Sequence, residues 1–288
     1  MAILDQRDKA GGREVYRHPV AVRAAHWASV LAMAVLLFSG LQILNAHPAF
    51  YWGEVSRFAS PVMEIASVTT PEGELRGEVR IGKLAFDTTG VFGASPTADG
   101  QLAARAAPSW LTLPGYLDLG AGRRWHFAFA WVLVISGAVY AVHAIATRRF
   151  KVLLLPTRDE LKGLGQSLFD HLRLRFDHGR PGYNVLQKLA YLAVLWVLIP
   201  TMLLTGLAMS PAMHARLPLL GDLFGGRQSA RTFHFLVASG LVTFVAVHLA
   251  MVIAAGPWRE LRSMLTGWYA LGHRPDAKTP TPETGDAP

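Results

Sequence analysis

The chain of 288 residues contains no cysteine. This absence excludes disulfide bonds, a thiolate nucleophile, an iron–sulfur cluster held by cysteines and a c-type haem attached through C-x-x-C-H. It leaves the eleven histidines as the side chains best suited to bind a soft or borderline transition metal. It does not indicate a compartment, because a protein without thiols tolerates oxidising and reducing surroundings alike.

Charged residues are also scarce. They make up 17% of the chain, against roughly a quarter in ordinary soluble proteins, and 51% of the residues are hydrophobic. The net charge of +8 would suit a nucleic-acid partner if the basic residues clustered on one folded face. Instead they lie between long uncharged stretches, which is typical of membrane proteins. We therefore expect membrane lipid, and no nucleic acid, as a partner.

Four stretches of 21 to 23 residues lack Asp, Glu, Lys and Arg altogether. An α-helix needs about 20 apolar residues to cross the hydrocarbon core of a bilayer. In lipid, a helix satisfies every backbone amide within its own segment. The sequence therefore predicts an all-α integral membrane protein built as a four-transmembrane-helix bundle. The predicted spans are residues 24–44, 125–146, 189–209 and 233–255.

The segments on the two sides of these spans differ in positive charge. The segments before the first span, between the second and third, and after the fourth hold 18 Lys and Arg residues, against 10 in the other two. Because Lys and Arg are enriched in cytoplasmic loops, we expect both termini in the cytoplasm and a location in the bacterial inner membrane. The polar segments 1–13 and 269–288 are expected to be disordered, and residues 14–268 form the predicted transmembrane domain.

The segment between the first two spans, residues 47–122, is too long for a simple connection and is extracytoplasmic in this topology. Apolar residues alternate around Val79, Ile81, Leu84 and Phe86 and are followed by a turn signal at residues 87–90. This pattern favours a small β-hairpin. The long loop is either a docking surface for an extracytoplasmic partner or an extended segment without a function of its own.

Five histidines lie within the predicted spans, where an ionisable residue is expensive and usually functional. His234 and His248 share the fourth span, 14 residues apart, on nearly one helical face and about 21 Å apart along the axis. His126 is expected at the level of His234, and His26 at the level of His248. Two imidazoles at each level are what a six-coordinate haem iron binds. The pattern therefore predicts two haem sites.

Two further patterns accompany these histidines. Arg23, Arg123 and Arg231 each stand three residues before a histidine, where arginine can pair with a haem propionate. The alternative is the positive flank of any membrane span. Every span also contains a hydroxyl residue followed by glycine, which leaves room for a flat macrocycle or serves helix packing. The glycines expected to face a macrocycle are Gly40, Gly137 and Gly240, whereas packing is favoured for Thr205-Gly206.

The remaining histidines are harder to assign. His143 follows His126 by 17 residues, which turns it about 100° away from the face of His126. It is an alternative ligand, a contact to a propionate or a quinone, or an interfacial residue. Six others lie in loops and are expected to face solvent: His18, His47, His171, His178, His214 and His273.

Three segments together resemble the cytochrome b561-like membrane subunits: Tyr16-Arg-His-Pro with Arg23-x-x-His26-Trp27, the His234-x13-His248 helix, and residues 182–188. These subunits include the b-type cytochromes of nickel–iron hydrogenase, the formate dehydrogenase gamma subunit and the thiosulfate-reductase type. The resemblance covers residues 14–268. It implies a four- or five-helix bundle with two b-type haems, held by His26 with His248 and by His126 with His234.

The resemblance also implies a function. Such subunits pass electrons between a membrane quinone and a peripheral oxidoreductase subunit, so no side chain is expected to be catalytic. The long outer loop departs from the smallest members, and we expect it to contact a periplasmic partner, for which a molybdopterin oxidoreductase is one candidate. By the same analogy, quinone binds near the cytoplasmic-side haem. Asn184, Gln187 and Lys188 are polar candidates there, although helix capping is the favoured interpretation of these residues.

Two other functions stay open. One is a stand-alone, quinone-linked haem oxidoreductase that acts on a small oxidant such as superoxide. The other is a small membrane transporter whose buried histidines carry protons or metal ions. Transporters often contain broken helices, for which Pro200 is the only hint in this sequence.

Overall fold

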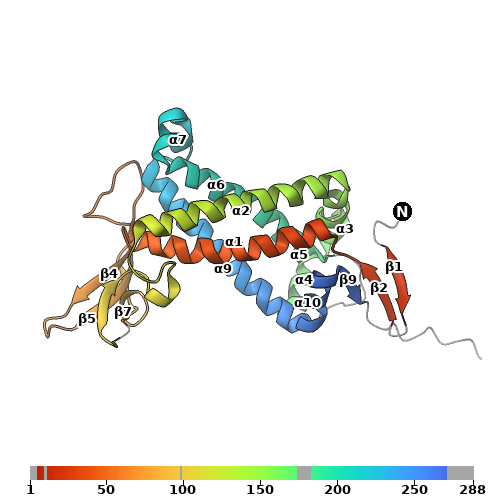
Figure 1. The fold of residues 1–288 in the computed structure, drawn as a ribbon, viewed down its shortest axis with the longest axis horizontal. Coiled ribbons are helices and arrows are strands. Elements are labelled where there is room, and N and C mark those ends of the chain that lie inside the picture. Colours follow the sequence, from red (N-terminus) through yellow and green to blue (C-terminus); the bar gives the residue numbers. More distant parts are fainter. Residues whose placement is uncertain (1–4, 10–11, 98, 174–182, 271–288) are drawn as a thin grey trace, which may run out of the picture.

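A computed structural model describes residues 5–9, 12–97, 99–173 and 183–270 (Figure 1). Within these residues the protein is mostly helical, and four helical segments are long and apolar enough to cross a membrane. The four predicted spans are therefore confirmed as helices. They are α1 (Val20–Leu44), α2 (Leu119–Ala146), the segment 185–208, and α9 (Arg227–Ala255).

Each of these helices begins four to six residues before the predicted span. The uncharged windows mark the part of a helix that suits hydrocarbon, whereas the helix itself extends into the membrane interface. Arg23, Lys188 and Arg231 accordingly lie inside the first turns of their helices. The ends of the helices agree with the predicted ends to within one residue.

The helices pack in two pairs, α1 along α2 and the third span against α9. The hydroxyl oxygens of Ser29 and Ser136, 3.0 Å apart, join α1 to α2. A contact between His126 of α2 and His234 of α9 connects the two pairs. At most 17% of the most apolar window of any span is buried within the protein. Helical faces this apolar and this uncovered require a lipid environment.

The third span is one continuous helical segment with a wide turn in its middle. It consists of α5 (Val185–Ala193), the π-helical turn η3 (Val194–Leu198) and α6 (Ile199–Ala208). Pro200 stands at the start of α6. A proline lacks an amide hydrogen and clashes with the carbonyl four residues earlier, and the wide turn before it accommodates both effects. No unwound backbone separates two half-helices here, so Pro200 gives the transporter interpretation no support.

Strands gather at the two opposite ends of the helices (Figure 1). We call the end with β1, β2 and β9 the near end and the end with β3 to β8 the far end. At the far end, residues 45–118 form antiparallel sheets in the orders β3-β4-β5-β6 and β7-β8. The bounds are β3 (Ala49–Phe50), β4 (Met63–Thr69), β5 (Leu75–Ile81), β6 (Leu84–Asp87), β7 (Gly93–Pro96) and β8 (Leu102–Arg105), followed by the 3₁₀ turn η1 (Ser109–Leu111).

The β5–β6 pair is the hairpin that the alternating apolar residues predicted. Val79 pairs with Phe86, and Ile81 with Leu84. The two sheets meet where Gly77 of β5 approaches the backbone just before β7. A β-carbon on Gly77 would lie 2.0 Å from the carbonyl oxygen of Phe92, so only glycine permits this contact.

The strand region is bonded to the start of α9. The carbonyl of Gly53 accepts hydrogen bonds from the amides of Gln228 and Ser229, at 3.0 and 3.2 Å. Thr232 donates its hydroxyl to the carbonyl of Tyr51 at 2.8 Å. The two bonds to Gly53 satisfy amides that a helix leaves unpaired in its first turn, and the Thr232 bond adds a side-chain link to the same loop. Two short helices complete the far end: α7 (Pro211–Arg216) and α8 (Leu219–Leu223).

The near end departs from the sequence prediction. Residues 1–13 and 269–288 were expected to be disordered, yet parts of both form a sheet in the order β1-β2-β9. Glu14 pairs with Arg7 at 2.7 Å and with Arg262 at 2.8 Å, and the Arg7 guanidinium lies 3.7 Å from the centre of the Trp268 ring. These contacts between distant segments stabilise strands that composition alone does not predict. The strands are β1 (Gln6–Lys9), β2 (Gly12–Tyr16) and β9 (Trp268–Ala270); residues 1–4, 10–11 and 271–288 lie outside the described ranges.

The connection between the second and third spans also lies at the near end. It contains a π-helical turn and two short helices, and one further helix follows α9. The bounds are η2 (Phe150–Leu154), α3 (Arg158–Lys162), α4 (Leu164–Leu172) and α10 (Pro257–Thr266).

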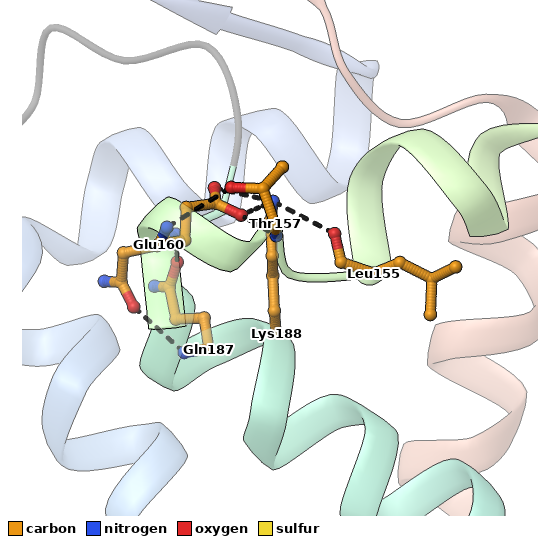
Figure 2. Close-up of polar contacts among 6 residues, drawn as sticks. Leu155, Thr157, Glu160, Gln187 and Lys188 are labelled. Carbon is orange, nitrogen blue, oxygen red and sulfur yellow. Dashed lines mark hydrogen bonds and ion pairs between the residues drawn. The ribbon is translucent and has the colours of Figure 1, made fainter. Parts of the chain in front are cut away.

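An ion pair attaches this connection to the third span (Figure 2). Lys188 of α5 is 6% exposed. Its Nζ lies 2.8 and 2.9 Å from the two carboxylate oxygens of Glu160 in α3, and it also donates to the carbonyl of Leu155. The bond from Lys188 is the main cause that lowers the pKa of Glu160, and the backbone amide of Thr157 adds to it.

Replacing Glu160 with glutamine is expected to destabilise the protein by about 1–3 kcal/mol, because it leaves a buried ammonium without its counter-charge. This loss of unfolding free energy is smaller than the loss expected for a fully buried ion pair, because the Glu160 side chain is 32% exposed. The stability that this ion pair contributes is present at pH values above the ordinary carboxyl pKa of 4.5. It is lost as the pH falls through the lower pKa that Glu160 has in the folded protein. Thermal unfolding in detergent at pH 7 measures the change.

The neighbouring pair Lys162–Asp159 is the matched control. Its side chains are 79% and 89% exposed, so Asp159→Asn should leave the unfolding temperature unchanged. Adding Lys188→Met to Glu160→Gln should recover part of the loss. An unfolding temperature equal to wild type in Glu160→Gln would show that the pair does not stabilise the near end.

Candidate haem sites

His126 and His234 face one another at the far end of α2 and α9. Their ring centres are 6.2 Å apart and their planes are inclined by 56°. Two imidazoles that bind one metal ion from opposite sides, each through a nitrogen at about 2 Å, have ring centres about 6 Å apart. The residues present therefore fit a metal centre that two imidazoles would hold.

Each of these histidines contacts a hydroxyl on a neighbouring helix. The Oγ of Ser39, in α1, lies 3.1 Å from Nδ1 of His126. The Oγ1 of Thr205, in α6, lies 2.9 Å from Nδ1 of His234. Both hydroxyls belong to the hydroxyl–glycine pairs of the sequence, but sequence reasoning did not connect them with the histidines. The signal was the recurrence of the pair in every span.

The glycines after these hydroxyls let the imidazoles approach. A β-carbon on Gly40 would lie 3.4 Å from Cε1 of His126, and one on Gly206 would lie 3.5 Å from Cε1 of His234. Gly40 therefore lies against the ring of His126, which we expect to bind the metal. Gly206 lies against the ring of His234, so its role is not limited to helix packing. Apart from the chain neighbours and the nearby backbone of the same helix, no described atom lies within 4 Å of a β-carbon position on Gly137, and Gly240 has one such neighbour at 3.9 Å.

His26 and His248 lie together at the near end. The two side chains are close enough that their positive charges would repel each other if both were protonated, and the His248 ring stacks on Phe244 with centres 5.9 Å apart. Nδ1 of His26 is buried and forms no hydrogen bond within the described residues. The structure thus places the four histidines at two levels, about 21 Å apart along α9.

The three arginines before the histidines have different surroundings. Arg23 donates a hydrogen bond to the carbonyl of Leu265 in α10. Arg231 donates to two carbonyls between α1 and β4, including that of His47 at 2.9 Å. Arg123 is exposed, with its guanidinium 5.7 Å from the centre of the Phe127 ring. Two of the three therefore hold the backbone at the ends of the helices, and their contact with a propionate stays a prediction.

A cavity of about 300 Å³ lies at the far end. It is lined in part by residues of the helical turns that precede His234 in α9. His47 was expected to face solvent, but it is half-buried and lines this cavity. Burial lowers the pKa of His47, and the neighbouring Arg231 lowers it further. The cavity is polar and basic. Its lining residues are His47, Ser56, Met209, Arg227, Gln228 and Arg231.

A smaller cavity, of about 50 Å³, lies at the near end between α1, α2 and the following connection. His18 lines it and is only 7% exposed, so the expectation that His18 faces solvent was wrong. Burial lowers the pKa of His18 to about 3, and Arg17 adds to the effect. His143 lines the same cavity with a buried Nε2 that has no hydrogen-bond partner in the described ranges. The side chains of His171, His178, His214 and His273 lie outside the described part of the structure.

The three polar candidates for a quinone contact have structural partners. Asn184 accepts a hydrogen bond from the amide of Gln187 at 2.9 Å, and Gln187 accepts one from the amide of Asn184 at 3.2 Å. This reciprocal capping of α5 confirms the capping interpretation. Lys188 is held by Glu160.

Comparisons with known proteins identify the family of this chain. The family described as prokaryotic cytochrome b561 matches residues 17–267. The chain is 29% identical over 257 residues to the "Putative protein-methionine-sulfoxide reductase subunit YedZ1" of Azospira oryzae, covering 88% of this chain and 98% of that relative. No solved structure matches. The family match contains all four long helices and the four paired histidines, and the chain belongs to the prokaryotic cytochrome b561 family.

Proposed function

We propose that this protein is a di-haem b-type cytochrome that transfers electrons between a membrane quinone and a peripheral oxidoreductase subunit. The observation that supports it best is the 6.2 Å separation of the His126 and His234 rings. When bound, a b-type haem supplies a one-electron redox centre. Within the described residues, no group of three or more candidate metal-ligand side chains occurs. Two imidazoles therefore suit a metal whose other positions are filled by a macrocycle.

The polypeptide contributes ligands, spacing and surroundings. In this proposal His126 and His234 hold the far-end haem, and His26 and His248 hold the near-end haem. The rigid helix α9 carries one ligand of each and fixes the distance between the two levels. The open position beside Gly137 and the sparsely contacted one beside Gly240 support the idea that these glycines leave space for a macrocycle. The apolar faces of the spans keep water away from both levels.

The topology proposed from charge places both termini and the near end in the cytoplasm of a bacterium, with the protein in the inner membrane. The far-end strand region then faces the periplasm and is the proposed docking site of the peripheral subunit. The relative from Azospira oryzae is named as a reductase subunit, which favours a reductase as the partner here. A molybdopterin enzyme is one candidate.

The experiment that tests the proposal is a dithionite-reduced minus oxidised spectrum of the purified protein, combined with haem quantitation. Two b-type haems per chain and reduction by added quinol are expected. A folded sample without haem would refute the proposal, and one haem per chain would refute its di-haem form. Copurification of a soluble subunit favours the proposed complex, whereas reduction by superoxide with no partner present favours the stand-alone oxidoreductase.

A further inference from the structure

The hydrogen bonds of Ser39 favour one tautomer of the His126 imidazole. The hydroxyl of Ser39 donates its single hydrogen to the carbonyl of Val35, one turn earlier in α1, at 2.6 Å. With that hydrogen engaged, the Ser39 oxygen is an acceptor for Nδ1 of His126 at 3.1 Å, and the backbone carbonyl of Leu36 is a second acceptor beside the same ring. This arrangement favours the neutral tautomer with its hydrogen on Nδ1 and its lone pair on Nε2.

The same arrangement recurs on the other side of the far-end pair. Thr205 donates its hydroxyl hydrogen to the carbonyl of Thr201 at 2.7 Å. With that hydrogen engaged, the Thr205 oxygen is an acceptor for Nδ1 of His234 at 2.9 Å, and the backbone carbonyl of Met202 is a second acceptor beside this ring. The two hydroxyls come from two different helix pairs, α1 with α2 and α6 with α9. In both histidines, Nδ1 contacts the hydroxyl, and the contacts favour the same tautomer.

At the near end, at least one of the two histidines has no such hydroxyl contact to its Nδ1 among the described residues. Nδ1 of His26 is buried and has no hydrogen-bond partner in the part of the chain that the structure describes. Its helix, α1, also carries Ser39, but that hydroxyl lies 13 residues away at the other level. The hydroxyl contacts therefore distinguish the far-end level from the near-end level.

We propose that Ser39 and Thr205 are positioning residues, which fix the tautomer and ring orientation of His126 and His234 and present Nε2 of each to the far-end haem iron. This proposal rests on the proposed haem function. A hydrogen bond from Nδ1–H to an oxygen makes the coordinating nitrogen more basic. A more basic ligand favours the ferric over the ferrous state, so the two hydroxyls lower the reduction potential of the far-end haem.

The experiment is a spectroscopic redox titration of Ser39→Ala and Thr205→Ala, together with electron paramagnetic resonance of the oxidised proteins. Each substitution should weaken the ferric preference of the far-end haem about threefold, which raises its midpoint potential by about 28 mV at 59 mV per tenfold change. The double variant should shift further, and its low-spin ferric signal should broaden as the ring orientations become less uniform. The near-end midpoint should not move.

Conservative variants and a matched control separate positioning from general packing. Ser39→Thr and Thr205→Ser keep the hydroxyl and should retain the wild-type midpoint and signal. Ser136→Ala removes another buried hydroxyl of the spans, which bonds Ser29 and the carbonyl of Leu133 and, among the described residues, no histidine, and should change neither readout. A far-end haem that is lost from the alanine variants but kept in the conservative ones would also support the proposal.

Two results have different meanings. If both alanine variants retain two haems with unchanged midpoint and unchanged resonance signal, the positioning role is refuted and the haem function stands. If the wild-type protein binds no haem, the proposed function itself fails.

Discussion

Replacement of His234 by alanine is expected to remove the far-end haem and to leave the near-end haem in place. The methyl group of alanine cannot bind iron, and His126 alone retains no partner across the 6.2 Å that separates the two rings. His248 lies about 21 Å away along the same helix and should keep its own site. Haem quantitation should fall from about two to about one per chain.

His126→Ala should give the same loss, because each member of the pair is needed. His47→Ala is the matched control at the same end: this histidine is half-buried and lines the far-end cavity, but it lies outside the pair. Both haems should remain in that variant. Retention of two haems in His234→Ala would refute the assignment of the far-end ligands.

Replacement of His248 or His26 by alanine should remove the near-end haem. These two residues interact at the near end of α1 and α9, and no hydroxyl holds Nδ1 of His26 within the described chain. We expect the loss in His26→Ala to be complete because the methyl group of alanine cannot bind iron, with the far-end spectrum and midpoint unchanged. Reduced minus oxidised spectra at low temperature resolve the two components.

His143 provides the decisive comparison at that end. It lines the near-end cavity and has a buried nitrogen without a partner in the described ranges, so it is the competing ligand. We expect His143→Ala to retain two haems. If His143→Ala loses a haem while His26→Ala keeps both, the near-end pair consists of His143 and His248 instead.

The four spans and the two histidine levels could be predicted because each depends on local periodicity. A 14-residue separation on one helix fixes both the face and the depth of His234 and His248 without knowledge of any other element. The helix starts could not be predicted from uncharged windows, since arginine and lysine occupy the first turns at the interface.

The contacts between distant segments could not be predicted. The sheet that includes residues 6–9 depends on Glu14 bonding Arg262, 248 residues further along the chain. The contact of Ser39 with His126 joins two helices whose relative rotation no local pattern specifies. The recurring hydroxyl–glycine pairs were visible, but their partners were not. His18 and His47 were misjudged for the same reason, because loop composition does not reveal which loops pack inward.

The bonds between residues 51–53 and the start of α9 make the strand region and the far-end histidine mechanically dependent on each other. Gly53 accepts two amides from the first turn of α9, and Tyr51 accepts the hydroxyl of Thr232, two residues before His234. Any force on this loop must either break these bonds or displace the turn that precedes His234. A protein that binds the far-end strands therefore acts on a segment rigidly attached to one ligand of the far-end site.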